Sequence, residues 1–438
     1  MTKRLILIMA ICLAQWMNRA SAENLIQIFD LALQQDPLIR QAEANRAAVL
    51  EAKPQSMARL LPTLAIAGTL NQSRYDTTNT FTQSQIGIQN FWDSTLYLKL
   101  IQPIYHNEYW VQLDQAENQI AQAEAEYAAA QQALLVRTAK AYFDVLWAED
   151  NLESARAEKR ALEQQLTQIN KRFEAGLATN MDVHEAQAGY DQSNAAEIAA
   201  QRSSRVAKVA LREIIGDGDV KLSPLAGNLP LQSPTPKELK DWKTMAQQNN
   251  LEIIAAQNQA ELARKSIDLQ FSGHLPTLDL VGSAGIADTN RPAGLVANSQ
   301  SVGVQLNIPV YQGGSVTSKV RQARHQLEAA MANVDKLRRT VDRQIEDAYY
   351  GIDFSINLVR ALNTTLESSE AAIRAAEAGL KAGIRTTVDV ITAQRNYYRA
   401  HRDYAQARYD FILNGLLLKL GAGALAREDL QTVNTWLH

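Results

Sequence analysis

Cysteine is almost missing from this chain of 438 residues, since the sole example is Cys12 inside a short apolar stretch at the N-terminus. Everything after that stretch lacks the residue. Disulfide bonds therefore contribute nothing to the stability of the rest of the chain, and a cysteine nucleophile is excluded there. The fold must be held together by packing and hydrogen bonds.

The chain also lacks an excess of charge of either sign. It contains 44 Lys and Arg and 47 Asp and Glu, so the formal net charge is −3. Proteins that bind nucleic acids usually carry a basic excess, so we expect no nucleic-acid partner. The six histidines stand at no metal-ligand spacing, and the chain contains no HExxH motif. We expect no enzymatic activity, no cofactor and no metal site.

Long hydrophobic runs are missing after the first 20 residues. Lys3 and Arg4 precede an apolar run at residues 5–13, and a small-x-small sequence ends at Ala22. This pattern predicts a secretory signal peptide, residues 1–22, that is cleaved after Ala22. No later run of about 20 apolar residues predicts a transmembrane helix. Strands of a membrane barrel are not excluded, because alternating segments have weak hydropathy signals.

Proline is missing from two long intervals, one between Ile104 and Ser223 and one after Pro309. Because proline is the strongest helix breaker, these intervals can hold very long helices. We expect such helices at residues 107–174 and 314–381, each about 100 Å long at 1.5 Å per residue. The second carries apolar residues at alternating steps of four and three, which indicates a coiled-coil seam. The seam begins with Val316, Val320, Ala323, Leu327, Ala330, Val334, Leu337 and Val341.

The two halves of the chain resemble each other. The sequence LPTL at 61–64 recurs at 275–278, and the turn AGL at 175–177 recurs as AGI at 382–384. Matches in the same order across half the chain indicate a tandem repeat. The expected organisation is a signal peptide at 1–22, a first repeat at 23–216, a linker or equatorial region at 217–237, a second repeat at 238–421 and a C-terminal equatorial tail at 422–438.

Each repeat is expected to contain a helix, two strands, a long helix, a tight turn and a further helix. The strands are expected at about 61–71, 94–105, 276–287 and 300–311, and the other helices at 25–59, 180–215, 238–271 and 387–420. The strand assignments depend on alternation, as where Val302, Val304 and Leu306 alternate with polar neighbours. A soluble sheet that packs on a helix and a barrel wall between lipid and water both fit this pattern.

Four strands cannot close a barrel with a useful lumen, and an open sheet leaves two exposed edges. A ring of identical subunits removes both problems. Three copies would supply twelve strands, an even number in the range of bacterial barrels. We therefore expect a mixed, mostly α fold: a homotrimer with a 12-stranded transmembrane β-barrel, four strands per protomer, continued by a 12-helix α-barrel of coiled coils around a hollow axis.

Four segments resemble those of one family: RFEAGL at 172–177, AGIRTTVDV at 382–390, AYFDVL at 141–146 and ARYDFI at 407–412. With them, and over essentially the whole chain after the signal peptide, the sequence is similar to the TolC family of outer-membrane channel-tunnels. The resemblance implies a location in the outer membrane with an extension into the periplasm. It also implies that the protein is the exit duct of a tripartite efflux pump or a type I secretion system, for drugs, small molecules or unfolded proteins.

The resemblance also implies partners: two further copies of the chain, outer-membrane lipid, a periplasmic adaptor, and an inner-membrane pump of the RND, ABC or MFS type. It places Gly176, Leu177, Gly383 and Ile384 at the hairpin tips that meet the adaptor. The residues alone indicate a helix C-cap with positive φ at each glycine, which is compatible with docking.

Arg385 and Asp389 are four residues apart and share a helix face. The residues alone indicate a solvated ion pair of little energetic weight. The resemblance makes Asp389 a ring of carboxylates at the periplasmic gate, where a trivalent cation would block conductance. It makes Arg385 part of a gate latch, for which Asp182 in the matching turn is the candidate partner.

Three positions depart from the family pattern. The second acidic ring would fall at Thr392, the latch tyrosine at Leu380 and the latch threonine at Met181. We therefore expect an entrance that is held less tightly and is less selective for cations.

A soluble periplasmic coiled-coil scaffold or adaptor is the alternative function. Adaptors usually carry one long hairpin, whereas this chain has two matched ones, and four stripes of alternating residues argue against a scaffold. The sequence selects no particular pump or adaptor. It does not rank drug efflux against protein secretion, because one lumen serves both.

Overall fold

The computed structural model describes residues 22–79, 84–218, 220–290 and 295–437. The expected signal peptide, apart from Ala22, lies outside the described residues. The chain forms two compact units, each of which draws segments from both halves of the repeat. The first unit contains the chain up to Glu43, Glu126–Ile253 and the chain from Leu337 onward, and the second contains Ala44–Ala125 and Ile254–Lys336.

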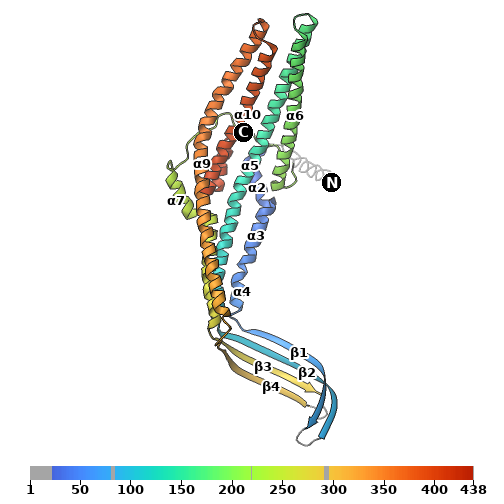
Figure 1. Cartoon of the computed structure of the whole chain (residues 1–438), viewed down its shortest axis with the longest axis vertical. Coiled ribbons are helices and arrows are strands. Elements are labelled where there is room, and N and C mark those ends of the chain that lie inside the picture. The colour runs from blue at the N-terminus through green and yellow to red at the C-terminus, as the bar shows by residue number, and fades with distance from the viewer. Residues whose placement is uncertain (1–21, 80–83, 219, 291–294, 438) are drawn as a thin grey trace, which may run out of the picture. The chain divides into compact units, whose positions relative to one another are not determined.

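The first unit is helical and contains two long hairpins (Figure 1). One hairpin consists of α5 (Asn107–Glu174), from residue 126 onward, and α6 (Asn180–Ile215). The other consists of α9 (Ser315–Lys381), from residue 337 onward, and α10 (Thr387–Gly421). The shorter helices are α2 (Leu25–Gln35), the start of α3 (Pro37–Leu50), α7 (Leu239–Asn249), the start of α8 (Leu251–Phe271) and α11 (Arg427–Asn434). Within the described part of the chain, none of the helices combines the length and the apolar character that crossing a bilayer requires.

The shorter helices are broken at matching positions of the two repeats. Asp36 is extended because the following Pro37 disfavours the helical region, and Asn250 is extended at the corresponding place. Each side chain then caps the next helix. The N–H of Ile39 donates to Asp36 Oδ2 at 3.2 Å, and the N–H of Ile253 donates to Asn250 Oδ1 at 3.1 Å. The expected helices at 25–59 and 238–271 are therefore each interrupted.

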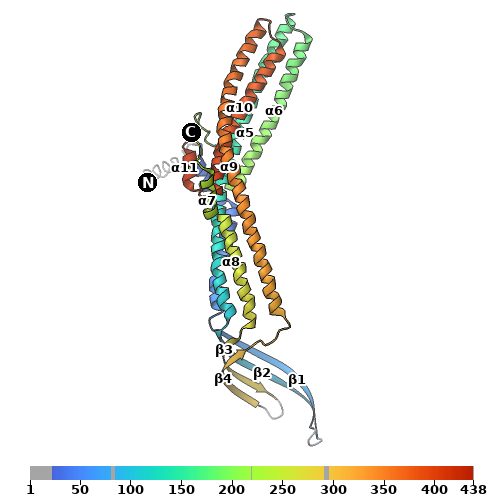
Figure 2. The same ribbon diagram turned by 60° about the vertical axis from the view of Figure 1, so that its left-hand side comes forward.

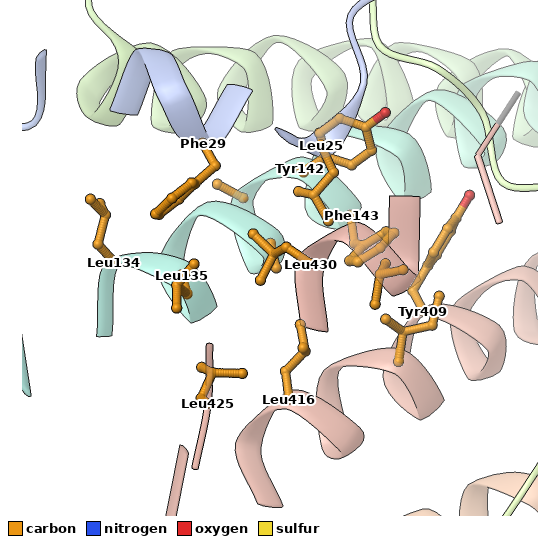
Figure 3. Close-up of a cluster of buried hydrophobic side chains, with 14 of the residues drawn as sticks. Leu25, Phe29, Leu134, Leu135, Tyr142, Phe143, Tyr409, Leu416, Leu425 and Leu430 are labelled. Atoms are coloured by element: carbon orange, nitrogen blue, oxygen red, sulfur yellow. The ribbon is translucent and has the colours of Figure 1, made fainter. Parts of the chain in front are cut away.

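The core of the first unit lies where the hairpins meet the shorter helices and the linker (Figure 3). Tyr142 and Phe143 of α5 are 0% and 1% exposed, and the ring of Phe143 stacks on that of Tyr409 with centroids 5.5 Å apart. The hydroxyl of Tyr142 donates to the carbonyl of Ser223 at 2.7 Å, which fixes the linker to α5. Burial of each large side chain contributes about 1.5–3 kcal/mol. Neighbours in Figure 3 are Leu25, Phe29, Leu134, Leu135, Leu416, Leu425 and Leu430.

The second unit contains one antiparallel sheet, whose strand order is β1-β2-β3-β4 (Figure 2). The strands are β1 (Thr63–Asn79), β2 (Ser84–Tyr105), β3 (Thr277–Thr289) and β4 (Leu295–Asn307). Helical segments in this unit are the end of α3, α4 (Ala52–Ala58), the first part of α5, most of α8, η1 (Ser272–His274) and the first part of α9. Among the described residues β1 and β4 pair on one side, so both are edge strands.

One face of the sheet is apolar from edge to edge. The register places Ile66 opposite Leu98, and Val304 opposite Leu280. Ile66 is 75% exposed, so neither a helix nor a second sheet covers this face within the described chain. Its members are Leu64, Ile66, Leu70, Leu96, Leu98, Leu100, Leu280, Ile286, Val302, Val304 and Leu306.

The opposite face of the sheet is largely polar, because successive side chains of a strand point to opposite sides. The hydroxyls of Thr69 and Thr95 are 2.6 Å apart across β1 and β2. Those of Ser283 and Ser301 are 2.8 Å apart across β3 and β4. The sheet therefore separates an exposed apolar surface from a hydrogen-bonding one.

The strand ends differ from the expected ones. β1 continues to Asn79 and β2 begins at Ser84, although alternation ends near residue 71 and resumes near 94. The additional residues are mostly polar at successive positions, so they carry no apolar period. β4 ends at Asn307 because Pro309 has no N–H for the strand ladder. The expected strand reached residue 311, so Val310 lies beyond the observed end.

Candidate functional site

Both hairpins end in the same tight turn. Gly176, with φ 71°, follows α5, and Gly383, with φ 73°, follows α9. The N–H of Gly176 donates to the carbonyl of Phe173 at 2.9 Å, and the N–H of Leu177 donates to that of Arg172 at 2.7 Å. This pair of bonds is a Schellman motif, whose left-handed residue is usually glycine because glycine has no Cβ.

The second turn repeats the motif and shows what it exposes. The N–H of Gly383 donates to the carbonyl of Leu380 at 3.2 Å, and the N–H of Ile384 donates to that of Gly379 at 2.9 Å. The residue after each glycine is strongly exposed, Leu177 to 69% and Ile384 to 82%. Each hairpin tip therefore presents open backbone beside an exposed aliphatic side chain.

The helices after the turns, α6 and α10, begin with the same capping box. The N–H of Asp182 donates to Thr179 Oγ1 at 3.2 Å, and the N–H of Thr179 donates to Asp182 Oδ2 at 2.8 Å. In the second hairpin Asp389 and Thr386 make the same two bonds, also at 3.2 and 2.8 Å. Each box satisfies two N–H groups that a helix start otherwise leaves unpaired.

The capping boxes keep both carboxyl groups charged. The hydroxyl and then the N–H of Thr179 are the main causes that lower the pKa of Asp182. For Asp389 the pKa is lowered first by the N–H of Thr386 and then by its hydroxyl, and the nearby Arg385 adds a smaller effect. Both groups are therefore fixed negative charges at neutral pH, each in the first turn of a helix, where the dipole also favours an anion.

Asp182 connects the two hairpins. Thr387, at the start of α10, donates a hydrogen bond from Oγ1 to Asp182 Oδ1 at 3.4 Å, and its side chain is buried. Further along, Gly189 of α6 lies against Ile391 of α10, since a Cβ added at residue 189 would be in ordinary contact with the Ile391 side chain at 3.5 Å. The first turns of α6 and α10 are thus in contact within one chain.

Arg385 lies beside the other predicted gate residue. Its Nη1 atom is 3.9 Å from Asp389 Oδ1, and the two side chains are 58% and 39% exposed. An ion pair this long and exposed contributes about 0–1 kcal/mol. Within one chain, the described ion pairs do not include one between Arg385 and Asp182.

The three positions that depart from the family pattern have different surroundings. Leu380 is 8% exposed and packs with Ala376 and Val390, so it belongs to the apolar contact between α9 and α10. Met181 is exposed beside the capping box of α6. Thr392 lies in an open groove of about 540 Å³ between α9 and α10, which Arg385 and Asp389 also line.

Three threonine hydroxyls belong to this site and were not predicted from the sequence. Those of Thr179 and Thr386 could have been found, because Thr-x-x-Asp before a helix is a capping-box signature. The contact of Thr387 could not, since it joins residues 205 positions apart. In the part of the chain that the structure describes, no three His, Asp or Glu side chains gather as possible metal ligands.

A family model described as "Outer membrane efflux protein" matches residues 28–217 and 242–418. The matched stretches contain the four described strands and the two hairpins, apart from the last three residues of α10. The match therefore includes the exposed apolar sheet face and the two hairpin tips.

Known proteins resemble the chain over most of its length. Outer membrane protein TolC of Vibrio cholerae serotype O1 is 37% identical over 442 residues, which cover 100% of this chain and 99% of that protein. The alkaline protease secretion protein AprF of Pseudomonas aeruginosa is 28% identical and covers 94% of this chain and 87% of its own length. The crystal structure of the Campylobacter jejuni CmeC outer membrane channel matches with a TM-score of 0.80 at 14% identity, over 95% of this chain and 90% of that one. The last comparison concerns the fold alone.

Proposed function

This chain belongs to the outer membrane efflux protein family, and we propose that three copies of it form an outer-membrane exit duct for efflux and type I secretion. As a member of that family it is a transport conduit and not an enzyme. The similarity to a protease secretion protein supports protein export as one task of the duct.

The observation that carries this function is the uncovered apolar face of the sheet. A soluble sheet buries its apolar face against another element, because exposed aliphatic area costs free energy in water. Here Ile66, Val302 and Val304 are 75%, 81% and 64% exposed, while the hydroxyl groups lie on the other face. Lipid acyl chains outside and water inside satisfy both faces.

The two edge strands support a closed ring of subunits. β1 and β4 each have one unpaired side among the described strands, and an unpaired edge cannot stay in the hydrocarbon region. Pairing of β4 of one protomer with β1 of the next removes every edge after three steps and gives a twelve-stranded barrel.

The outer helices of the two hairpins also carry surfaces that could pack against a neighbouring protomer in such a ring. α6 and α9 lie on the outer sides of the two hairpins in both views (Figures 1 and 2). Large apolar side chains are exposed there, namely Ile198, Val206 and Val209 on α6 and Tyr350 and Phe354 on α9. Contact between α6 of one protomer and α9 of the next would bury these residues and extend the duct as a wall of helices.

The hairpin tips are the proposed contact with a periplasmic adaptor. Gly176 and Gly383 expose backbone, and Leu177 and Ile384 offer aliphatic anchors that nothing in the described chain covers. A helical hairpin of a partner can bury such anchors in a groove. An inner-membrane pump would deliver cargo through that adaptor.

The periplasmic gate is the proposed role of the capped aspartates. In a trimer, Asp389 becomes three carboxylates around the axis, which attract cations. We place Arg385 at the contact with the neighbouring hairpin, where Asp182 of another protomer is the latch partner. Thr387 would hold α10 against α6 within each protomer in the closed state.

A soluble periplasmic scaffold is the alternative function. It would leave the apolar face of the sheet exposed to water, which is unfavourable in free energy. Purified protein reconstituted in a planar bilayer tests the two functions. The duct predicts long-lived ion channels and heat-resistant trimers in the outer-membrane fraction. A monomer that stays in solution without detergent and never conducts would support the scaffold.

A further inference from the structure

A cavity of about 330 Å³ opens in the first unit, away from the hairpin tips. Four helices form its walls: α5 through Ala129, Gln132 and Ala133, the start of α8, α9 near residues 344–348, and the last two turns of α10. Its volume is at the lower end of the range for pockets that bind small molecules. Neither the proposed gate nor the proposed docking tips line it.

Small residues create the space. Ala129, Ala133, Ala348 and Gly421 line the cavity, so four helices converge without large side chains to fill the volume between them. The close contact at Gly421 is structural, because an added Cβ would lie 2.9 Å from the Ile345 side chain.

Two side-chain amides hold the walls in place. The Nδ2 of Asn250 donates to the carbonyl of Gly421 at 2.9 Å, and this asparagine is 6% exposed. The Nε2 of Gln132 donates to the carbonyl of Leu425 at 3.1 Å, and also to that of Gly423. The start of α8 and the end of α10 are therefore fixed to each other and to α5, so the cavity exists before a ligand binds.

The lining combines aliphatic side chains with two carboxylates and with the amides of Gln132, Asn250, Gln344 and Asn414. Leu251, Leu417 and Leu420 supply the aliphatic surface, and Leu417 is 43% exposed although its helix is packed on the other side. Glu252 and Asp347 are the charged residues of the lining. Asp347 pairs with Arg343 at 2.9 Å, whereas Glu252 has no ion-pair partner among the described residues.

We infer that this cavity binds small cationic amphiphiles, with the aliphatic part of the ligand against Leu417 and Leu420 and its ammonium or iminium group beside Glu252. The inference goes beyond the proposed function, because it concerns a ligand site inside the helical unit of one chain rather than the passage of cargo. Charge complementarity selects the cation, because the lining contains carboxylates and no lysine or arginine. Apolar burial supplies most of the affinity, and the ion pair discriminates against neutral and anionic molecules.

Binding of rhodamine 6G, a lipophilic cation, to the purified full-length protein in an uncharged detergent tests this inference. Fluorescence anisotropy is measured against protein-free micelles, and a neutral coumarin dye serves as the probe without charge. We expect saturable binding of rhodamine 6G and much weaker binding of the coumarin. Binding no greater than in micelles, or equal binding of both dyes, would overturn the inference.

Three variants locate the site. Glu252→Gln keeps the shape and should weaken rhodamine binding about fivefold, the effect of one partly screened ion pair. Ala133→Leu fills the cavity and should abolish saturable binding. Asp403→Asn removes an exposed carboxylate of α10 outside the cavity and should change nothing. Equal binding by all three variants would place the dye elsewhere and contradict the inference.

Single-channel conductance of the same preparations separates this inference from the proposed function. Conducting channels that bind no dye would refute the cavity site while the duct stands. Protein that binds the dye through Glu252 but never conducts would refute the duct while the cavity stands.

Discussion

Thr387 Oγ1 donates a hydrogen bond to Asp182 Oδ1 at 3.4 Å, and thereby joins the start of α10 to the start of α6. The threonine is 2% exposed, so water does not readily replace the bond when it breaks. The contact lies at the end of the hairpins, and in the proposed trimer a small displacement of α10 there would widen the entrance.

Replacement of Thr387 by Val should loosen this contact without changing the volume of the side chain. The loss of one partly buried hydrogen bond is about 1 kcal/mol per protomer. We expect channels with a larger mean conductance and more frequent open periods in planar bilayers. Thr167→Val is the matched control, because its hydroxyl donates within α5 to the carbonyl of Glu163. Identical conductance of both variants and the parent would exclude Thr387 from the gate.

Replacement of Asp389 by Asn should remove most of the block by a trivalent cation, because it takes three charges from one ring. We expect the blocking concentration to rise about tenfold or more, as for the loss of a strong electrostatic contact. Asp403→Asn is the control, since it removes an exposed carboxylate further along α10, away from the proposed gate. A block that persists in the Asp389 variant would refute the single ring.

The pH dependence of that block follows from the capping box. The N–H and hydroxyl of Thr386 lower the pKa of Asp389, so its carboxylate stays charged as the pH falls through the ordinary carboxyl range. Neighbouring carboxylates in the ring oppose this shift. We expect the block to be retained at about pH 5 and lost only in more acidic solution. Loss of the block between pH 7 and 6 would contradict the assignment to Asp389.

Replacement of Leu177 by Glu should abolish export while trimers still form. Leu177 is 69% exposed and has no packing role in the described chain, so its loss costs little stability. An anchor of a helical partner typically contributes about 2 kcal/mol or more, so transport should fall tenfold or more. Gln168→Glu adds the same charge to an exposed position nine residues earlier on α5 and should be neutral. Unimpaired export in the Leu177 variant would exclude docking at this tip.

Replacement of Tyr409 by Phe should destabilise the helical unit. The hydroxyl of Tyr409 donates to Asp150 Oδ2 at 2.6 Å, and both side chains are largely withdrawn from water. The loss leaves a carboxylate without its donor, which costs about 1–3 kcal/mol. Thermal unfolding in detergent, followed by circular dichroism, measures the difference, and Tyr397→Phe is the control.

The protonation of Asp150 determines how the stability loss of the Tyr409→Phe variant changes with pH. Burial raises the pKa of Asp150, and the bond from Tyr409 partly offsets that rise. A carboxyl group with a raised folded pKa stabilises the fold when protonated, and this contribution is lost as the pH rises through the folded pKa. The Phe variant should therefore lose more stability at pH 8 than at pH 4. An equal loss at both values would show that Asp150 is not the group involved.

The long helices could be predicted from the sequence because the positions of proline limit where a long helix can form. Proline is missing over both intervals, and α5 and α9 extend through them. The four strands were visible for a similar reason, since alternating apolar residues mark the sheet face that stays uncovered. The break at Asp36 was visible in the sequence, because Pro37 follows it, and was overlooked. The break at Asn250 has no proline and depends on a side chain that caps the following helix.

The site was predictable where it is local. Gly176 and Gly383 follow from the turn geometry, and the capping boxes follow from Thr-x-x-Asp. The bond from Thr387 to Asp182 and the burial of Leu380 depend on how α10 packs on its neighbours. No spacing in the sequence encodes such packing.

Chemical labelling at two neighbouring positions of β1 tests the central claim most directly. The chain after the expected signal peptide has no cysteine, so Ala65→Cys and Ile66→Cys each introduce a single thiol on opposite faces of the sheet. In a reconstituted trimer, a water-soluble thiol reagent should modify Cys at 65 and reduce the conductance, whereas Cys at 66 should react only with a lipid-soluble maleimide. Modification of the residue 66 thiol by the water-soluble reagent at the same rate would contradict a pore wall with lipid on its apolar face.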